Sequence, residues 1–317
     1  MGSVRRTGPA TGILAVAAWV WISVLPAVAA GVQVYTSANG LPSDWVTALA
    51  VDPDGKIWAG TGNAGIALLD PKSGRVSAYR VKDGLPSDEV TSIALFDGKV
   101  YVGTASGIGI FDGSRWETVV KTGTVTFRNV RLAASPDGKE LWASSVYLSG
   151  GTVRFDGKEW KFMGGEGRGL FNEIEGFAFL PDGVLMGSGQ GTAYLHKGTD
   201  VVPLTEGLPP TNIFAVAAWK GNAVAGTGAG LFERSGGKWK PVALPAGMAG
   251  IPVFALSVRD GVLAAGTQEG VVLLGKGESP KAFTQANGLP PGKVTAVAAG
   301  EGFVAAGTAR GLAVIKE

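Results

Sequence analysis

Short apolar runs separated by turn sequences recur along the whole chain. In the first copy, Asp-Pro-Asp-Gly at 52–55 and Pro-Lys-Ser-Gly at 71–74 divide such runs. Aspartate, proline and glycine in these clusters are typical of tight turns between antiparallel strands. The chain shows no long apolar period of 3.6 residues, which would indicate a helix. The copy therefore predicts four short strands: Val46–Val51, Lys56–Gly60, Gly65–Leu69 and Arg75–Tyr79.

The same unit repeats with a nearly constant period. Gly-Leu-Pro occurs at 40–42, 84–86, 207–209 and 288–290. A Gly-Thr step or its equivalent, spaced by about 40 residues, begins at Gly60, Gly103, Ala143, Gly187, Gly226, Gly266 and Gly307. Seven units of four antiparallel strands predict an all-β fold, a seven-bladed β-propeller. A stack of four-stranded solenoid turns is the structural alternative.

The two ends of the chain complement each other. The last unit supplies only three strands, whereas Val32–Thr36 is a spare strand before the first unit. The sequence at 34–43 also parallels that at 282–291, where an outer strand ends. We therefore expect the N-terminal strand to complete the last blade and close the ring, which removes two unpaired sheet edges.

The first 30 residues are expected to lie outside the fold. Arg5 and Arg6 precede an apolar run, and Ala27-Val28-Ala29 follows Pro26, which is the pattern of a cleaved secretory signal peptide. An uncleaved membrane anchor is the alternative. We predict a signal peptide at 1–30, a single propeller domain at 31–317, and a periplasmic or secreted protein.

The repeat unit resembles a known family. Gly-Leu-Pro-Ser, Val-Thr, Asp-x-x-Gly-x-x-Trp-x-Gly-Thr and Gly-Ile are similar to the two-component regulator propeller repeat, with residues 40–66 matching most closely. The resemblance implies an extracytoplasmic sensor-type propeller. In that family the propellers, often two rings, are linked through a membrane helix to a histidine kinase. This chain shows one ring and no kinase, so the resemblance implies recognition without a kinase.

Composition excludes several kinds of chemistry. The chain has no cysteine and one histidine, so thiolate and multi-histidine metal sites are excluded. The leader holds two of the 28 basic residues and none of the 26 acidic ones, which leaves no basic excess for nucleic acid or an anionic membrane. We expect no metal, no cofactor and no catalytic residue, and we expect His196 to lie at the surface.

Candidate binding residues are sought where the units differ. One face should gather the segments that lead into each innermost strand, including a variable position at Thr47, Thr91, Arg131, Glu175, Phe214, Phe254 and Thr295. Units 3 and 4 depart most from the repeat, with an extended loop at 146–151 and a glycine-rich segment at 164–169. The predicted ligand-binding residues are Trp45, Arg128, Asn129, Arg131, Tyr147, Asn172, Glu173, Glu175 and Phe214.

These observations favour an exported, monomeric propeller that binds a small molecule, glycan or peptide on one face. Aromatic surface with a few convergent polar groups is typical of such sites. Two alternatives remain open. One is a protein-interaction scaffold with an envelope protein as partner. The other is a propeller lyase or hydrolase that uses Glu173 and Glu175, although Glu175 could instead pair with Arg131 across adjacent blades.

Overall fold

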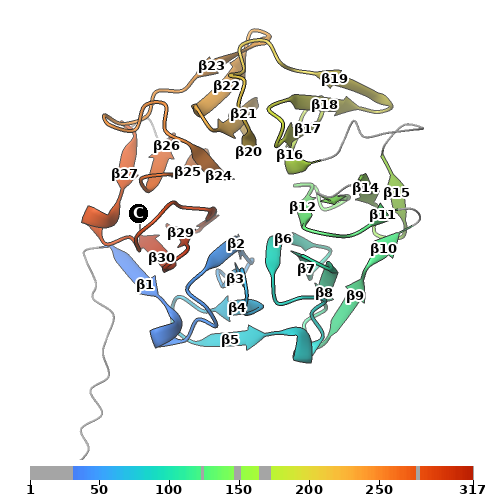
Figure 1. Ribbon diagram of the computed structural model, residues 1–317, viewed down its shortest axis with the longest axis vertical. Helices are drawn as coiled ribbons and strands as arrows, with labels where there is room; N and C mark the ends of the chain where they lie inside the picture. Colours follow the sequence, from blue (N-terminus) through green and yellow to red (C-terminus); the bar gives the residue numbers. More distant parts are fainter. Residues whose placement is uncertain (1–30, 123–124, 146–150, 164–172, 276–278, 317) are drawn as a thin grey trace, which may run out of the picture.

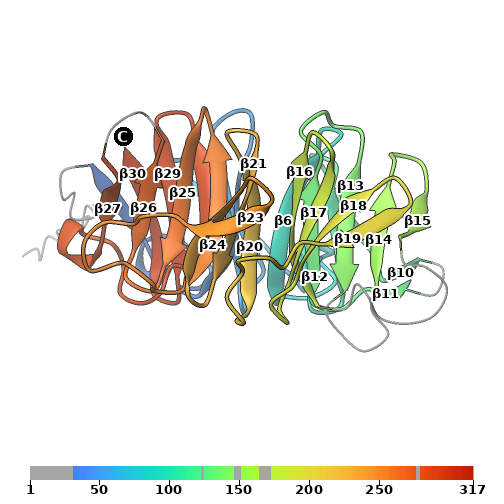
Figure 2. The ribbon, with the colours of Figure 1, turned by 90° about the horizontal axis from the view of Figure 1, so that it is seen from above.

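Seven four-stranded antiparallel sheets stand around a common axis, as the computed structural model shows (Figure 1). The structure describes residues 31–122, 125–145, 151–163, 173–275 and 279–316. Seen from the edge (Figure 2), the ring is a flattened disc whose strands run between its two faces. The predicted seven-bladed propeller is confirmed.

The blades are numbered in chain order, with strands given from the axis outward. Blade 1 consists of β2 (Val46–Val51), β3 (Ile57–Thr61), β4 (Ile66–Leu69) and β5 (Val76–Tyr79). Blade 2 consists of β6 (Val90–Phe96), β7 (Lys99–Thr104), β8 (Gly107–Phe111) and β9 (Trp116–Val119). Blade 3 consists of β12 (Val130–Ala134), β13 (Leu141–Ser145), β14 (Thr152–Phe155) and β15 (Trp160–Phe162). Blades 4 and 5 are β16 (Ile174–Leu180), β17 (Gly183–Ser188), β18 (Ala193–Lys197) and β19 (Asp200–Pro203); and β20 (Ile213–Trp219), β21 (Asn222–Thr227), β22 (Gly230–Ser235) and β23 (Lys238–Pro241).

Blades 6 and 7 are β24 (Val253–Arg259), β25 (Val262–Thr267), β26 (Val271–Leu274) and β27 (Lys281–Phe283); and β28 (Ala296–Gly300), β29 (Phe303–Thr308), β30 (Gly311–Lys316) and β1 (Val32–Tyr35). A short ribbon, β10 (Lys121–Thr122) with β11 (Val125–Thr126), precedes blade 3. The described residues also form three short 3₁₀ helices, η1 (Ser37–Asn39), η2 (Val81–Asp83) and η3 (Gln285–Asn287).

The N-terminal strand closes the ring, as predicted. β1 runs antiparallel to β30, with Val32 opposite Ile315 and Tyr35 opposite Leu312. Figure 1 shows β1 beside the C-terminal end of the chain. Because β1 and β28–β30 form one blade, the first and last parts of the sequence share a sheet. The solenoid alternative is therefore wrong.

Apolar side chains between neighbouring blades form the core. Trp58 of blade 1 packs in one cluster with residues of blade 2, and its ring lies 5.8 Å from that of Phe111. Tyr101 likewise reaches Phe155 of blade 3, with 6.5 Å between ring centroids. These aromatic residues of the second strands thus pack between neighbouring blades. These interfaces bury large apolar surfaces and so hold the ring together.

The repeated glycines permit close contact between blades. A Cβ atom built on Gly103 would lie 2.5 Å from the carbonyl oxygen of Val130 in the next blade. At Gly226 the corresponding distance to the carbonyl oxygen of Val253 is 2.8 Å. No larger residue fits at such a separation without moving the backbone.

The leader predicted at 1–30 lies outside the described residues, so its cleavage stays a prediction. Within the described part of the chain, no helix is both long and apolar enough to cross a membrane.

Candidate functional site

One face of the disc, here called the loop face, carries the segments that lead into the innermost strands. Main-chain hydrogen bonds tie these segments to the turns after the second strands. The amide of Gly62 donates to the carbonyl oxygen of Trp45 at 2.9 Å, and that of Ala105 donates to Glu89 at 3.0 Å. The opposite face, with the turns between first and second strands, is called the turn face.

A β-bulge recurs near the start of the innermost strands. The pairing with the second strand skips one residue between Val46 and Ala48, and equivalent shifts occur in blades 2, 4, 5 and 6. A bulge re-aims the side chain of the extra residue. We call this position, together with its sequence equivalents in blades 3 and 7, the ring position; in blade 3 Arg131 is paired with Ser144 without a bulge. The ring position is occupied by Thr47, Thr91, Arg131, Glu175, Phe214, Phe254 and Thr295, all half-buried.

Threonine occupies the ring position in blades 7, 1 and 2. The hydroxyl of Thr47 donates to the carbonyl oxygen of Val90 at 2.7 Å, and that of Thr91 donates to Val130 at 2.7 Å. The hydroxyl of Thr295 donates to Val46 at 3.1 Å across the closure of the ring. These three side chains therefore join neighbouring innermost strands.

An ion pair occupies the ring positions of blades 3 and 4. Nε and Nη2 of Arg131 both lie 2.9 Å from Oε2 of Glu175, and Nη1 donates to the carbonyl oxygen of Thr91 at 3.0 Å. The two side chains are 31% and 23% exposed. The structure thus shows the pairing of Arg131 with Glu175 that was open at the sequence level, and the two charges satisfy each other.

Two aromatic rings occupy the ring positions of blades 5 and 6. The centroids of Phe214 and Phe254 are 5.1 Å apart, and Nζ of Lys293 lies 4.8 Å from the centroid of Phe254. Lys293 is exposed, and no ion pair joins it to another residue in the described part of the chain. Phe214, Phe254 and Lys293 are here called the aromatic arc.

The other predicted site residues are spread around the loop face. Trp45 is 47% exposed in blade 1, and its indole lies over Gly62, where a Cβ would come within 2.5 Å of the ring. Arg128 is exposed, and its main-chain amide donates to Oγ of Ser145 at 3.0 Å. Asn129 is half-buried and adopts a left-handed backbone with φ of 45°.

Glu173 has the same backbone conformation in blade 4, with φ of 64°, and its carbonyl oxygen accepts from Gly189 at 2.9 Å. Tyr147 and Asn172 lie outside the described residues. The structure therefore brings Arg131 and Glu175 together, whereas it places Phe214 with Phe254. Neither Phe254 nor Lys293 was among the predicted site residues, although Phe254 occupies the ring position.

The expectation that His196 lies at the surface is wrong. His196 is 7% exposed, and its ring meets that of Trp142 edge-on, with 5.2 Å between centroids. Strand β18 places it against blade 3, where burial lowers its pKa and the positive charge of Arg154 lowers it further. This histidine is therefore a packing residue between two blades.

Comparison with known proteins agrees with the resemblance seen in the repeat. Residues 40–63 match the family model described as two component regulator propeller, which confirms that resemblance. No curated protein matches the chain.

Solved structures share the fold at low sequence identity. The extracellular domain of BT3049 from B. thetaiotaomicron, described as a hybrid two component system, is 19% identical with a TM-score of 0.74; the match covers 90% of this chain and 41% of that one. Virginiamycin B lyase from Staphylococcus aureus, in a catalytically inactive form with quinupristin, is 11% identical with a TM-score of 0.69, covering 90% and 99%. YCF48 bound to D1 peptide is 11% identical with a TM-score of 0.69, covering 92% and 99%. The chain thus spans about two fifths of the first of these proteins.

Proposed function

We propose that the chain is an exported, monomeric recognition propeller, periplasmic or secreted, that binds a small molecule, glycan or peptide on its loop face. The match to the two component regulator propeller repeat supports a sensor-type role. The extracellular domains among the structures with the same fold are consistent with a place outside the cytoplasm.

The proposal rests on one observation: different blades carry different types of residue at the ring position. The ring position has the same backbone setting in most blades, yet it holds threonine in three blades, an ion pair in two and phenylalanine in two. The repeat requires no such difference. Sequence variation on a constant scaffold is where function is expected.

The aromatic arc is the part of this face best suited to hold a ligand. Phe214 and Phe254 are half-buried rings in contact with each other, and Lys293 adds a cation without an acidic partner among the described residues. Such a surface suits a flat or apolar group that also carries an anionic or hydrogen-bond-accepting group. The Arg131–Glu175 pair bounds the site as a fixed polar edge, since its charges already compensate each other.

A thermal-shift screen of sugars and peptides tests this proposal. A ligand that binds only the folded state raises the melting temperature. Compounds that stabilise the wild type should lose their effect on Phe254→Ala and Lys293→Ala and keep it on Phe162→Ala. Phe162 is a matched control because it is 53% exposed on the outer strand of blade 3. Equal shifts in all four proteins would place the ligand away from the aromatic arc.

The second candidate function is a protein-interaction scaffold. Trp45 favours it, since a 47% exposed tryptophan on the loop face is the kind of residue that anchors protein interfaces. One protein of the same fold is also bound to a peptide. Under this alternative an envelope protein would be retained stoichiometrically, and Trp45→Ala would release it while Phe254→Ala would not.

A further inference from the structure

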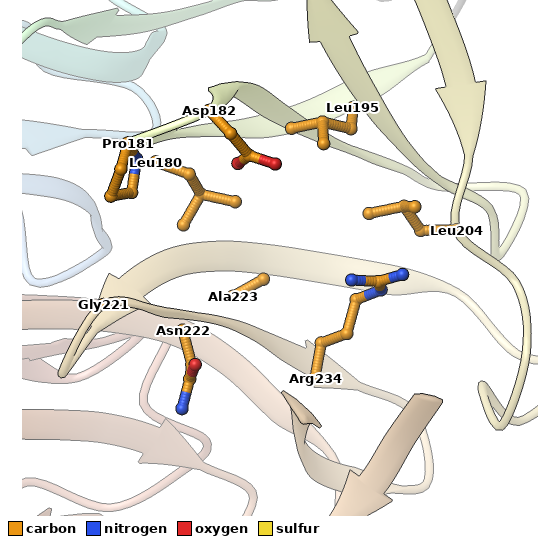
Figure 3. Close-up of a pocket in the computed structure, with 9 residues that line it drawn as sticks. All are labelled: Leu180, Pro181, Asp182, Leu195, Leu204, Gly221, Asn222, Ala223 and Arg234. Atoms are coloured by element: carbon orange, nitrogen blue, oxygen red, sulfur yellow. The ribbon is translucent and has the colours of Figure 1, made fainter. Parts of the chain in front are cut away.

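A pocket opens between blades 4 and 5 near the turn face, at the other end of these blades from the ring positions. Its volume is about 290 Å³. Figure 3 shows its lining: Leu180, Pro181, Asp182, Leu195, Leu204, Gly221, Asn222, Ala223 and Arg234. The turns that contribute Asp182 and Gly221 connect the first and second strands of the two blades. The pocket is therefore separate from the aromatic arc.

The body of the pocket is apolar. Leu195 and Leu204 are 5% and 8% exposed and belong to the core between the two blades. Leu180 packs against the same cluster, and Ala223, which also lines the pocket, is 5% exposed. These side chains would bury a hydrocarbon group from water, which is favourable in proportion to the area covered.

The Arg234 guanidinium differs from the other polar groups of this pocket in its hydrogen bonding. Its Nε is buried and donates to no acceptor among the residues that the structure describes. No ion pair joins its guanidinium to another described residue. In Figure 3 the guanidinium points into the space between Leu204 and Asp182. A buried donor without an acceptor is costly, and a carboxylate matches the guanidinium fork with two parallel hydrogen bonds.

The charged side chains near Arg234 determine which ligand charge the pocket favours. Asp182 is held by Lys197, with 2.8 Å between Oδ2 and Nζ, and this hydrogen bond lowers the pKa of the Asp182 carboxyl, with a smaller effect from Arg234. The carboxylate of Glu233 accepts from the side-chain amide of Asn222 at 2.8 Å. Asp182 and Glu233 thus each accept from another side chain, and among the described residues neither forms an ion pair with the guanidinium of Arg234.

We propose that this pocket binds a free monocarboxylic acid whose hydrocarbon body lies against Leu180, Leu195 and Leu204 and whose carboxylate lies on Arg234. The volume suits a body of modest length, about ten non-hydrogen atoms if each takes the space of one water. Octanoate has this size. The site is independent of the loop face, so the proposal stands or falls apart from the proposed function.

Calorimetric titration of the full chain with octanoate tests the proposal. We expect a dissociation constant of about 1 mM or lower. Methyl octanoate, which lacks the charge, and acetate, which lacks the body, should each bind at least about tenfold more weakly. No heat of binding with octanoate up to about ten times that concentration, or equal binding of the methyl ester, would overturn the proposal.

Substitutions locate the site. Arg234→Gln should weaken octanoate binding at least about tenfold, and Arg234→Lys should weaken it less, because it keeps the charge and loses the fork. Arg75→Gln, on an exposed hairpin of blade 1, makes the same charge change and should leave binding unchanged. If Arg234→Gln does not fold, the comparison of Arg234→Lys with wild type decides: undiminished binding contradicts the site.

A peptide C-terminus carries the same carboxylate chemistry. Acetyl-Ala-Ala-Leu with a free carboxylate and its C-terminal amide are therefore included as probes. Tighter binding of the free peptide than of octanoate, abolished in the amide, would overturn the assignment to a free acid.

Discussion

Tyr35 offers the sharpest test of ring closure. It lies in β1, at the opposite end of the sequence from its partner Leu312 in β30, and it is 3% exposed. It packs in the cluster that joins blades 7 and 1, together with Ile57 and Leu69. If β1 completes the last blade, then Tyr35→Ala weakens the contact between the two ends of the ring.

The expected loss is large for a residue so close to a terminus. Replacing a buried aromatic residue by alanine costs about 3–5 kcal/mol, because burial is lost and a cavity remains. A substitution in an undocked terminal segment costs no more than about 0.5 kcal/mol. Since a domain's stability is about 5–15 kcal/mol in total, the two cases are easily separated. Deleting residues 31–38 removes Val32 as well and should abolish cooperative unfolding.

Urea unfolding followed by tryptophan fluorescence measures the effect. The whole transition of Tyr35→Ala should shift to lower urea as one step. Ser37→Ala is the control, because Ser37 is exposed two residues further along and its side chain faces solvent. A Tyr35→Ala midpoint equal to that of wild type, or a truncated chain that unfolds like the full one, would refute the closure.

Other predictions concern single interactions. A double-mutant cycle of Arg131→Ala and Glu175→Ala should give a coupling free energy of about 1 kcal/mol, since the pair is well aligned but partly exposed; a coupling of zero would show that the pair adds nothing. His196 has a lowered pKa when folded, so protonation favours the unfolded chain. The free energy of unfolding should therefore fall as the pH falls below the unfolded value of about 6.5, and His196→Gln should remove that part of the slope; an unchanged slope would contradict the buried neutral ring. Gly103→Ala should lower the free energy of unfolding by more than about 2 kcal/mol, because its Cβ would lie 2.5 Å from a backbone oxygen. Gly176→Ala should lower it much less, because the nearest atom to that Cβ would be 3.4 Å away. Similar melting temperatures for the two variants would argue against the close approach at Gly103.

The architecture was predictable because each unit repeats the same turn sequences and the same short apolar runs. Turn sequences at 52–55 and 71–74 mark the strand ends, and β2 begins and ends where the sequence predicted. The parallel between residues 34–43 and 282–291 was enough to place β1 in the last blade. Such features are local or periodic, so one sequence reveals them.

Side-chain neighbours across blades were less predictable. Phe214 was assigned to a site with residues of blades 3 and 4, but its ring meets Phe254 in the opposite direction around the axis. The bulge that aims both side chains depends on pairing with the second strand, which the sequence does not display. The same limit applies to His196, because a strand pattern does not show which residue the next blade will cover.

A crystal structure of the protein with the strongest compound from the thermal-shift screen would show directly whether the loop face binds the ligand. We expect ligand density on the loop face against Phe214, Phe254 and Lys293. Density confined to the turn face or the outer strands, with the aromatic arc empty, would contradict it.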